Sequence, residues 1–279
     1  IIDKKSYKEI STFSGCGLLA GGSIALNSQG ILLLLNYFFE PAVVTARSIS
    51  LQVYNAANQF VTNFRTAANP QIVKQLAAGD VAGSHNLLLQ STKFSYYLML
   101  ILCLPICLLA SPILNLWLVE VPEYAVPFLQ LVVIQSLFSV FDASLYTALY
   151  AKGRIRENAL ISPTVGFLRF PLVYILFKMG FSPLALSWTS IATSFILGCI
   201  IKPALIVKYA EYSWMEVIHT LYVCLIVTLV AAPIPVITYV LLNVEDNLWH
   251  AVIVLLLSVS SVAAAVWFFG LTKHMKELM

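Results

Sequence analysis

PAVVTARSISLQVYNAANQFVTNFRTAANP, residues 41–70, is too polar for an ordinary membrane helix and too regular for a loop. At about 100° per residue on an α-helix, its polar side chains fall within roughly half the circumference. A helix of about 30 residues is about 45 Å long, enough to cross a bilayer, and its polar groups cannot face lipid without large cost. We therefore expect the polar face to line water or other protein. The face comprises Thr45, Arg47, Ser48, Gln52, Asn55, Asn58, Gln59, Thr62, Asn63, Arg65, Thr66 and Asn69.

The composition around this stretch is that of an integral membrane protein. Hydrophobic residues make up 60% of the 279-residue chain and charged residues 10%, and the mean hydropathy is +0.88. These values lie far outside the range of soluble domains. The net charge of +3 is small and spread along the chain, so it gives no indication of a nucleic-acid partner. Membrane lipids are the expected surroundings.

The apolar segments predict an all-α, polytopic transmembrane bundle, because none alternates in the manner of a membrane β-strand. We expect about eight spans, with a six-helix lobe over residues 1–212, and with two additional helices and a cytoplasmic tail over 213–279. Residues 71–85 are expected to form a partly helical surface connection, and Pro105 is expected to kink its span. The expected spans are residues 11–39, 41–70, 86–114, 124–150, 158–177, 183–201, 215–242 and 248–269.

The basic residues predict how these spans are oriented. If the amino terminus is cytoplasmic, twelve lysines and arginines lie on the cytoplasmic side and only Lys178 lies in an outer loop, as the positive-inside rule requires. Both termini of the chain are then cytoplasmic. The twelve are Lys4, Lys5, Lys8, Lys74, Lys93, Lys152, Arg154, Arg156, Lys202, Lys208, Lys273 and Lys276.

Three arginines and one aspartate lie within the expected spans, where each must pair, snorkel or face a cavity. Arg47 is expected to face a cavity or to snorkel to the interface, and Arg65, near the inner end, has the same two explanations. Arg169 has either a structural partner, such as a carbonyl or Asp142, or a substrate contact. Asp142 is either a proton or cation relay or one half of a structural ion pair.

The polar stripe as a whole also has two explanations. Polar residues can join transmembrane helices through hydrogen bonds worth about 0.6–2 kcal/mol each. Twelve on one face exceed what packing needs, which favours a solvated cavity. Guanidinium groups suit a bidentate grip on phosphate or carboxylate, and amides suit sugar hydroxyls. The candidate substrate-binding residues are Arg47, Gln52, Asn55, Asn58, Gln59, Arg65 and Arg169, and the candidate ion-coupling residue is Asp142.

No enzyme motif accompanies these residues. The sequence has no GxxxxGK[ST], HExxH or GxSxG pattern, so ATP hydrolysis, zinc proteolysis and serine hydrolysis lack their usual parts. The four histidines are scattered without ligand spacing, and the five cysteines all sit in apolar stretches. We therefore expect no catalytic residue, no metal site and no cofactor.

The run QGILLLLNYFFEPAVVTARSISLQVYNAANQFVTNFRTAANPQIVKQLAAGD, residues 29–80, resembles the region around the seventh and eighth helices of bacterial polysaccharide and O-antigen flippases. These flippases belong to the multidrug, oligosaccharidyl-lipid and polysaccharide exporter superfamily. The downstream pattern is also similar: KFSYYLML, then LW followed by a P-E turn, AKGRIR and a closing FFGLTK. The resemblance spans nearly the whole chain.

This resemblance implies the second lobe of a two-lobe transporter plus two carboxyl-terminal helices. The first lobe would be missing, and we expect the sequence, which opens on Ile1, to be the later part of a longer protein. The cavity would lie between the lobes, with the polar helix as one wall. The implied substrate is a lipid-linked oligosaccharide, an isoprenoid diphosphate bearing a glycan. Alternating access would move it to the outer leaflet of the bacterial cytoplasmic membrane for surface polysaccharide, lipopolysaccharide or O-antigen synthesis.

Three other interpretations of the function remain open. A multidrug and toxin exporter of the same fold would usually need a carboxylate for organic cations, whereas three arginines and one aspartate within the spans favour an anionic substrate. A membrane-embedded polysaccharide polymerase or glycosyltransferase needs catalytic groups in a sizeable outer loop, and the expected outer loops have only about 3–10 residues. A purely structural subunit is the third alternative.

Overall fold

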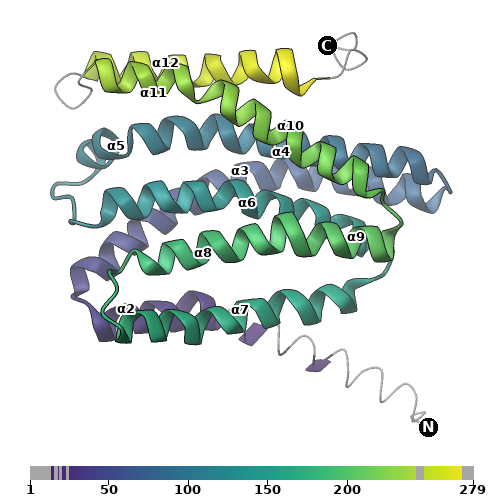
Figure 1. Ribbon diagram of the computed structural model, residues 1–279, viewed down its shortest axis with the longest axis horizontal. Coiled ribbons are helices and arrows are strands. Elements are labelled where there is room, and N and C mark those ends of the chain that lie inside the picture. The colour runs from purple at the N-terminus through teal and green to yellow at the C-terminus, as the bar shows by residue number, and fades with distance from the viewer. Residues whose placement is uncertain (1–13, 16–17, 19–20, 23–24, 243–247, 272–279) are drawn as a thin grey trace.

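The computed structural model describes residues 14–15, 18, 21–22, 25–242 and 248–271, and this part of the chain forms helices and short connections without a strand. The long helices run side by side across the molecule (Figure 1). The elements are η1 (Leu26–Gly30), α2 (Ile31–Phe38), α3 (Pro41–Ala77), α4 (Val81–Leu108), α5 (Ala110–Trp117), α6 (Ala125–Ala151), α7 (Ile155–Lys178), α8 (Ala185–Phe195), η2 (Ile196–Ile201), α9 (Lys202–Ala210), α10 (Trp214–Ala231), α11 (Pro233–Leu241), α12 (Leu248–Ala265) and η4 (Val266–Gly270).

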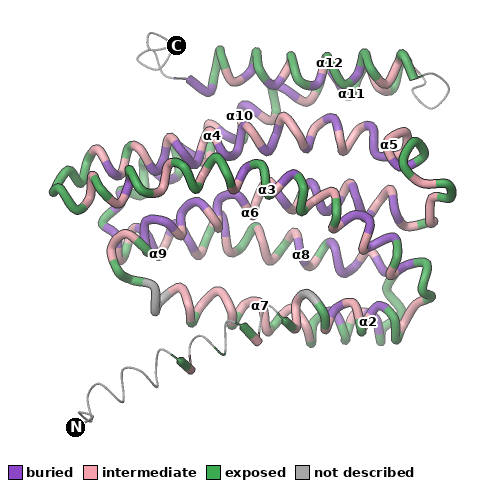
Figure 2. Tube along the Cα trace, turned by 180° about the vertical axis from the view of Figure 1, so that it is seen from behind, coloured by how far each residue is buried: buried purple, intermediate pink, exposed green. Residues whose placement is uncertain are grey.

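Helices α3, α4 and α6 form the centre of the bundle. On one side of this centre α8 packs against α6 and α7 against α8, and on the other side α12 packs against α4, α10 and α11. The main buried cluster joins Ala46 of α3, Met99 of α4 and Phe128 of α6. From behind, α3 lies across this stack of helices (Figure 2). One side of α3 is therefore buried against α4 and α6, and its other side is open.

Within the described residues, six helices are long and apolar enough to cross a membrane, which confirms the expected all-α, multi-pass class. Their outward side chains, such as Leu172, Leu225 and Leu256, are large, apolar and exposed, as contact with hydrocarbon requires. The span expected at 41–70 is a helix but is too polar to count among the six, and the span expected at 11–39 lies partly outside the described residues. The six are Val81–Leu108, Ala125–Ala151, Asn158–Lys178, Ala185–Ala210, Trp214–Leu241 and Leu248–Gly270.

The connection expected over residues 71–85 is much shorter in the structure. Helix α3 continues through Pro70 to Ala77, and α4 begins at Val81. Tertiary contacts hold the segment beyond the proline, because Ile72 is buried and its carbonyl accepts a 3.0 Å hydrogen bond from the Ser84 hydroxyl. Gly79, with φ of +84°, makes the turn. Helix α3 therefore continues seven residues beyond the expected end of the span at Pro70, and the expected connection is largely helical. Packing and the Ser84 hydrogen bond offset the loss of one backbone donor at the proline.

Two expected spans are broken near their prolines. Helix α4 ends at Leu108, three residues after Pro105, and α5 follows at Ala110. Helix α10 ends at Ala231, and α11 begins at Pro233 with a change of direction (Figure 1). Pro233, at the first position of α11, lacks the amide hydrogen that would continue the helical ladder of α10.

The span expected at 183–201 is longer in the structure, because α8, η2 and α9 form one continuous helical segment, Ala185–Ala210. Lys202 therefore lies inside a helix and is only 2% exposed, not in a cytoplasmic connection as expected. Lys93 likewise lies within α4 and is half-buried. The number of basic residues in the loops is correspondingly smaller, and the orientation of the bundle stays a prediction.

The connections near the Ala77 end of the bundle are joined by an ion pair and by stacked rings. The Lys152 ammonium contacts the Glu211 carboxylate at 3.0 Å, and the rings of His85 and Tyr212 stack with centroids 3.7 Å apart. The hydrogen bond and charge of Lys152 lower the pKa of Glu211, so this contact weakens when acid protonates the carboxylate. Burial raises the pKa of Tyr212, which keeps its hydroxyl neutral.

We expect Gly198→Ala to destabilise the protein. A Cβ at Gly198 would lie 2.5 Å from the carbonyl oxygen of Phe138, so η2 and α6 would have to separate. Overpacking of this kind costs about 1–3 kcal/mol, and thermal unfolding followed by circular dichroism in detergent measures it. Gly22→Ala is the control, because its Cβ would make an ordinary 3.5 Å contact with Phe167. Equal unfolding temperatures for the two variants would contradict the packing described here.

Candidate functional site: a polar helix face with unpaired arginines

The open side of α3 carries amide groups. Gln52, Asn55 and Gln59 are exposed and Asn58 is half-buried, and the Gln59 amide donates a 2.9 Å hydrogen bond to Asn63. Exposed positions recur along the length of α3 (Figure 2). The exposed faces of α7, α10 and α12 are instead dominated by large apolar residues. Hydrocarbon can cover those faces but not the open side of α3, which must face water or protein.

Arg47 turns away from this open side into the protein. Its side chain is only 6% exposed, and its guanidinium lies over the ring of Phe128, 5.8 Å from the centroid. Nη1 is buried without a hydrogen-bond partner among the described residues. Arg47 therefore does not snorkel in this structure, and it has no carboxylate partner in the described part of the chain.

Arg169 of α7 lies close enough to Arg47 for the two cations to repel each other. Its Nη2 donates a long 3.5 Å hydrogen bond to the carbonyl of Asn27, and its Nε is buried with no partner among the described residues. Of the partners expected from the sequence, a carbonyl is thus present and Asp142 is not. Two like charges with unused donors create a region of positive potential that suits an anion.

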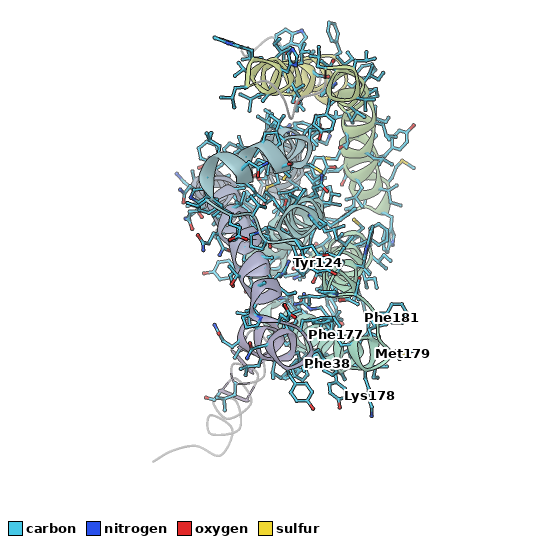
Figure 3. All side chains as sticks on the ribbon, turned by 90° about the vertical axis from the view of Figure 1, so that its left-hand side faces the viewer. Phe38, Tyr124, Phe177, Lys178, Met179 and Phe181 are labelled. Atoms are coloured by element: carbon cyan, nitrogen blue, oxygen red, sulfur yellow. The ribbon has the colours of Figure 1, made fainter. Side chains whose placement is uncertain are left out.

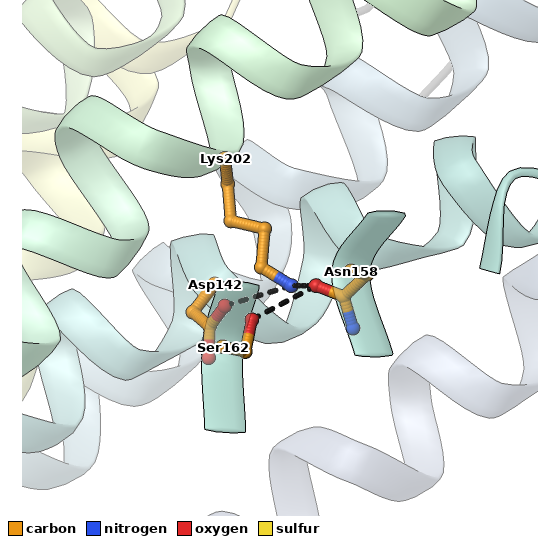
Figure 4. A network of polar contacts seen from close by, with 4 residues as sticks. All are labelled: Asp142, Asn158, Ser162 and Lys202. Atoms are coloured by element: carbon orange, nitrogen blue, oxygen red, sulfur yellow. Dashed lines mark hydrogen bonds and ion pairs between the residues drawn. The ribbon is translucent and has the colours of Figure 1, made fainter. Parts of the chain in front are cut away.

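Asp142 of α6 belongs to a buried ion pair. Its Oδ1 lies 3.0 Å from the Lys202 ammonium, which also donates to the side-chain oxygen of Asn158. The same oxygen accepts a 2.9 Å hydrogen bond from Ser162 (Figure 4). The Asp142 side chain is 32% exposed, whereas that of Lys202 is 2% exposed. Asp142 is therefore the member of the pair that water can reach.

Arg65 of α3 makes one long side-chain hydrogen bond within the described part of the chain. Its Nη2 lies 3.4 Å from the Thr62 hydroxyl on the same helix, and Asp142 attracts it electrostatically. It is half-buried. A guanidinium with one long neutral hydrogen bond retains most of its donor capacity for another ligand.

A pocket of about 590 Å³ opens at the end of the bundle opposite Ala77, where the α2–α3, α5–α6 and α7–α8 connections meet. Tyr124 and Phe181 line it (Figure 3), as do Glu40 and Glu123. Glu40 directly precedes α3, and Glu123 lies two residues before the start of α6. Helix amino termini carry positive partial charge, so these carboxylates complement the helices that follow them.

The structure divides the predicted site residues into separate environments. Arg47 and Arg169 lie together, Arg65 lies with Asp142, and the amides of the open face stand between the two arginines of α3. Sequence reasoning missed Lys202 and its partner Asn158. The sequence does indicate a buried lysine, because Lys202 is the single charged residue in the apolar run IATSFILGCIIKPALIV, residues 191–207. The expected span, 183–201, ended one residue before it.

Comparisons of the chain with models of known protein families, with curated proteins and with solved structures found no match. The fold and the hydropathy of its helices define an all-helical, multi-pass membrane protein.

We expect Arg169→Met to stabilise the protein, because the substitution removes the repulsion between two poorly paired cations. The gain should be about 1–2 kcal/mol, in the range of other stabilising substitutions, and thermal unfolding without added phosphate measures it. Arg65→Met is the matched control, because it removes an arginine that Asp142 attracts. A fall in unfolding temperature for Arg169→Met as large as that for Arg65→Met would contradict this account of the site.

Proposed function

We propose that the chain forms one lobe of a secondary transporter for a lipid-linked oligosaccharide. Its substrate is an isoprenoid diphosphate bearing a glycan, which the complete protein moves by alternating access across the bacterial cytoplasmic membrane for surface polysaccharide or O-antigen synthesis. A preceding lobe of the same protein would cover the open side of α3 and complete the cavity. The resemblance of residues 29–80 to polysaccharide flippases supports this proposal.

The observation that carries the proposal is the pair of arginines at Arg47 and Arg169. Two guanidinium groups that repel each other and keep unused buried donors are costly for a protein that lacks an anionic ligand. A diphosphate supplies several acceptor oxygens and at least two negative charges, so it satisfies both groups at once. An organic cation would add a third positive charge there, which disfavours the multidrug-exporter alternative.

The amide side chains on the open side of α3 also support the proposal. Amide side chains can exchange hydrogen bonds with sugar hydroxyls as they do with water, so a glycan can move along Gln52, Asn55 and Gln59 without a large barrier. Arg65 lies about 27 Å from Arg47 along α3, at 1.5 Å per residue. The helix thus carries a basic residue beyond each end of this amide run, with Arg47 turned into the protein and Arg65 half-buried.

We expect Arg47→Gln and Arg169→Gln each to reduce export of surface glycan by about tenfold or more, because each removes a buried, charge-assisted contact to the diphosphate. The assay uses the full-length gene product at equal membrane abundance and measures surface glycan and cytoplasm-facing lipid-linked glycan. Replacement by lysine should restore part of the export, since lysine keeps the charge without the bidentate geometry.

Lys178→Gln is the matched control, because it removes an exposed cation at the end of α7 and away from both arginines. Wild-type export in Arg47→Gln and Arg169→Gln would refute the proposed diphosphate site. Unchanged glycan together with altered resistance to cationic dyes would favour the drug-exporter alternative.

A further inference from the structure

Lys202 is the most completely buried charged residue in the described part of the chain, and its position is set by packing around it. The π-helical turn η2 ends at Ile201, directly before it. Within that turn Gly198 lies so close to α6 that a Cβ would meet the Phe138 carbonyl oxygen at 2.5 Å and the Asp142 amide nitrogen at 3.2 Å. The glycine therefore lets the backbone approach α6 and holds the Lys202 ammonium against the Asp142 carboxylate. π-Turns of this kind are frequent at functional sites.

Asp142 interacts with two cations. Lys202 lies 3.0 Å away on α9. Arg65 of α3 attracts the same carboxylate and lies about one helical turn before Asn69, which accepts a 3.1 Å hydrogen bond from Thr147 of α6. The ring of Tyr146 lies 5.1 Å from the Lys202 nitrogen, and Asn158 supplies the other oxygen around it. The Lys202 ammonium contacts Oδ1 and offsets the charge of the carboxylate, so Asp142 attracts a second cation less strongly than an unpaired carboxylate would.

We propose that Lys202 is a positioning residue that keeps Asp142 away from Arg65, so that the Arg65 guanidinium stays available to an anionic ligand. At 2% exposure Lys202 cannot touch a ligand itself. Without Lys202, Asp142 turns to Arg65 and neutralises it. Arg65 would then be the first basic position that a diphosphate meets from the Ala77 end, an extension that rests on the proposed function.

The proposal predicts different consequences for the two members of the pair. Lys202→Met leaves a half-exposed carboxylate free to bind Arg65, so Arg65 loses its reactivity. Asp142→Asn leaves Arg65 free but strands a buried ammonium, so this variant should lose the most thermal stability. A purely structural ion pair would instead affect Arg65 to a similar degree whichever partner is removed.

The test is the rate at which phenylglyoxal, an arginine-specific reagent, modifies Arg65 in the full-length protein in lipid nanodiscs, read by mass spectrometry of its peptide. Lys202→Met should slow the modification at least fivefold. Asp142→Asn and the double variant Lys202→Met/Asp142→Asn should stay within twofold of wild type. Lys152→Met is the matched control, since it removes a lysine from the exposed pair with Glu211 at the same end of the bundle.

An unchanged rate in Lys202→Met, or an equal decrease in Asp142→Asn, would overturn the proposal. Binding of geranyl diphosphate to the same samples separates this inference from the proposed function. Loss of binding in Lys202→Met with recovery in the double variant supports both. If the modification rates follow the expected pattern but wild type does not bind geranyl diphosphate, the role of Lys202 stands and the proposed substrate does not.

Discussion

A polar group inside a membrane protein must find a partner, and α3 is where this constraint is most severe. The helix buries Ala46, Ile49 and Val61 against its neighbours and turns amide side chains to its open side. Helices α4 and α6 supply the apolar partners, and the other helices extend the bundle to either side of them. A bundle with one amide-lined face and otherwise apolar outer faces needs two kinds of surroundings, and hydrocarbon is only one of them.

The cations of the bundle differ in how they are compensated. Lys202 has a carboxylate, an amide oxygen and an aromatic ring. Arg47 and Arg169 repel each other, and neither is paired with an acid in the described part of the chain. A cation that the protein compensates fully contributes to structure, whereas one that it leaves partly uncompensated stores an electrostatic attraction for an anion.

The amino-acid pattern was sufficient to predict the helical class and most of the helices, because long apolar runs have few alternatives in a membrane. It was less reliable at prolines: Pro70 lies inside a helix, whereas breaks occur beside Pro105 and Pro233. The difference depends on tertiary packing, which no local pattern contains. The Asp142–Lys202 pair was missed for the same reason, since residues sixty positions apart meet only when α9 packs on α6.

Helix α3 is long and continuous, so it is expected to move as a rigid unit. Its 37 residues form a rod about 55 Å long, and no proline interrupts it between Arg47 and Arg65. A tilt of about 10° around one end would displace the other by about 10 Å, given 1.5 Å per residue. The surroundings of Arg47 and Arg65 therefore cannot change independently, and opening one end of the open side mechanically closes or widens the other.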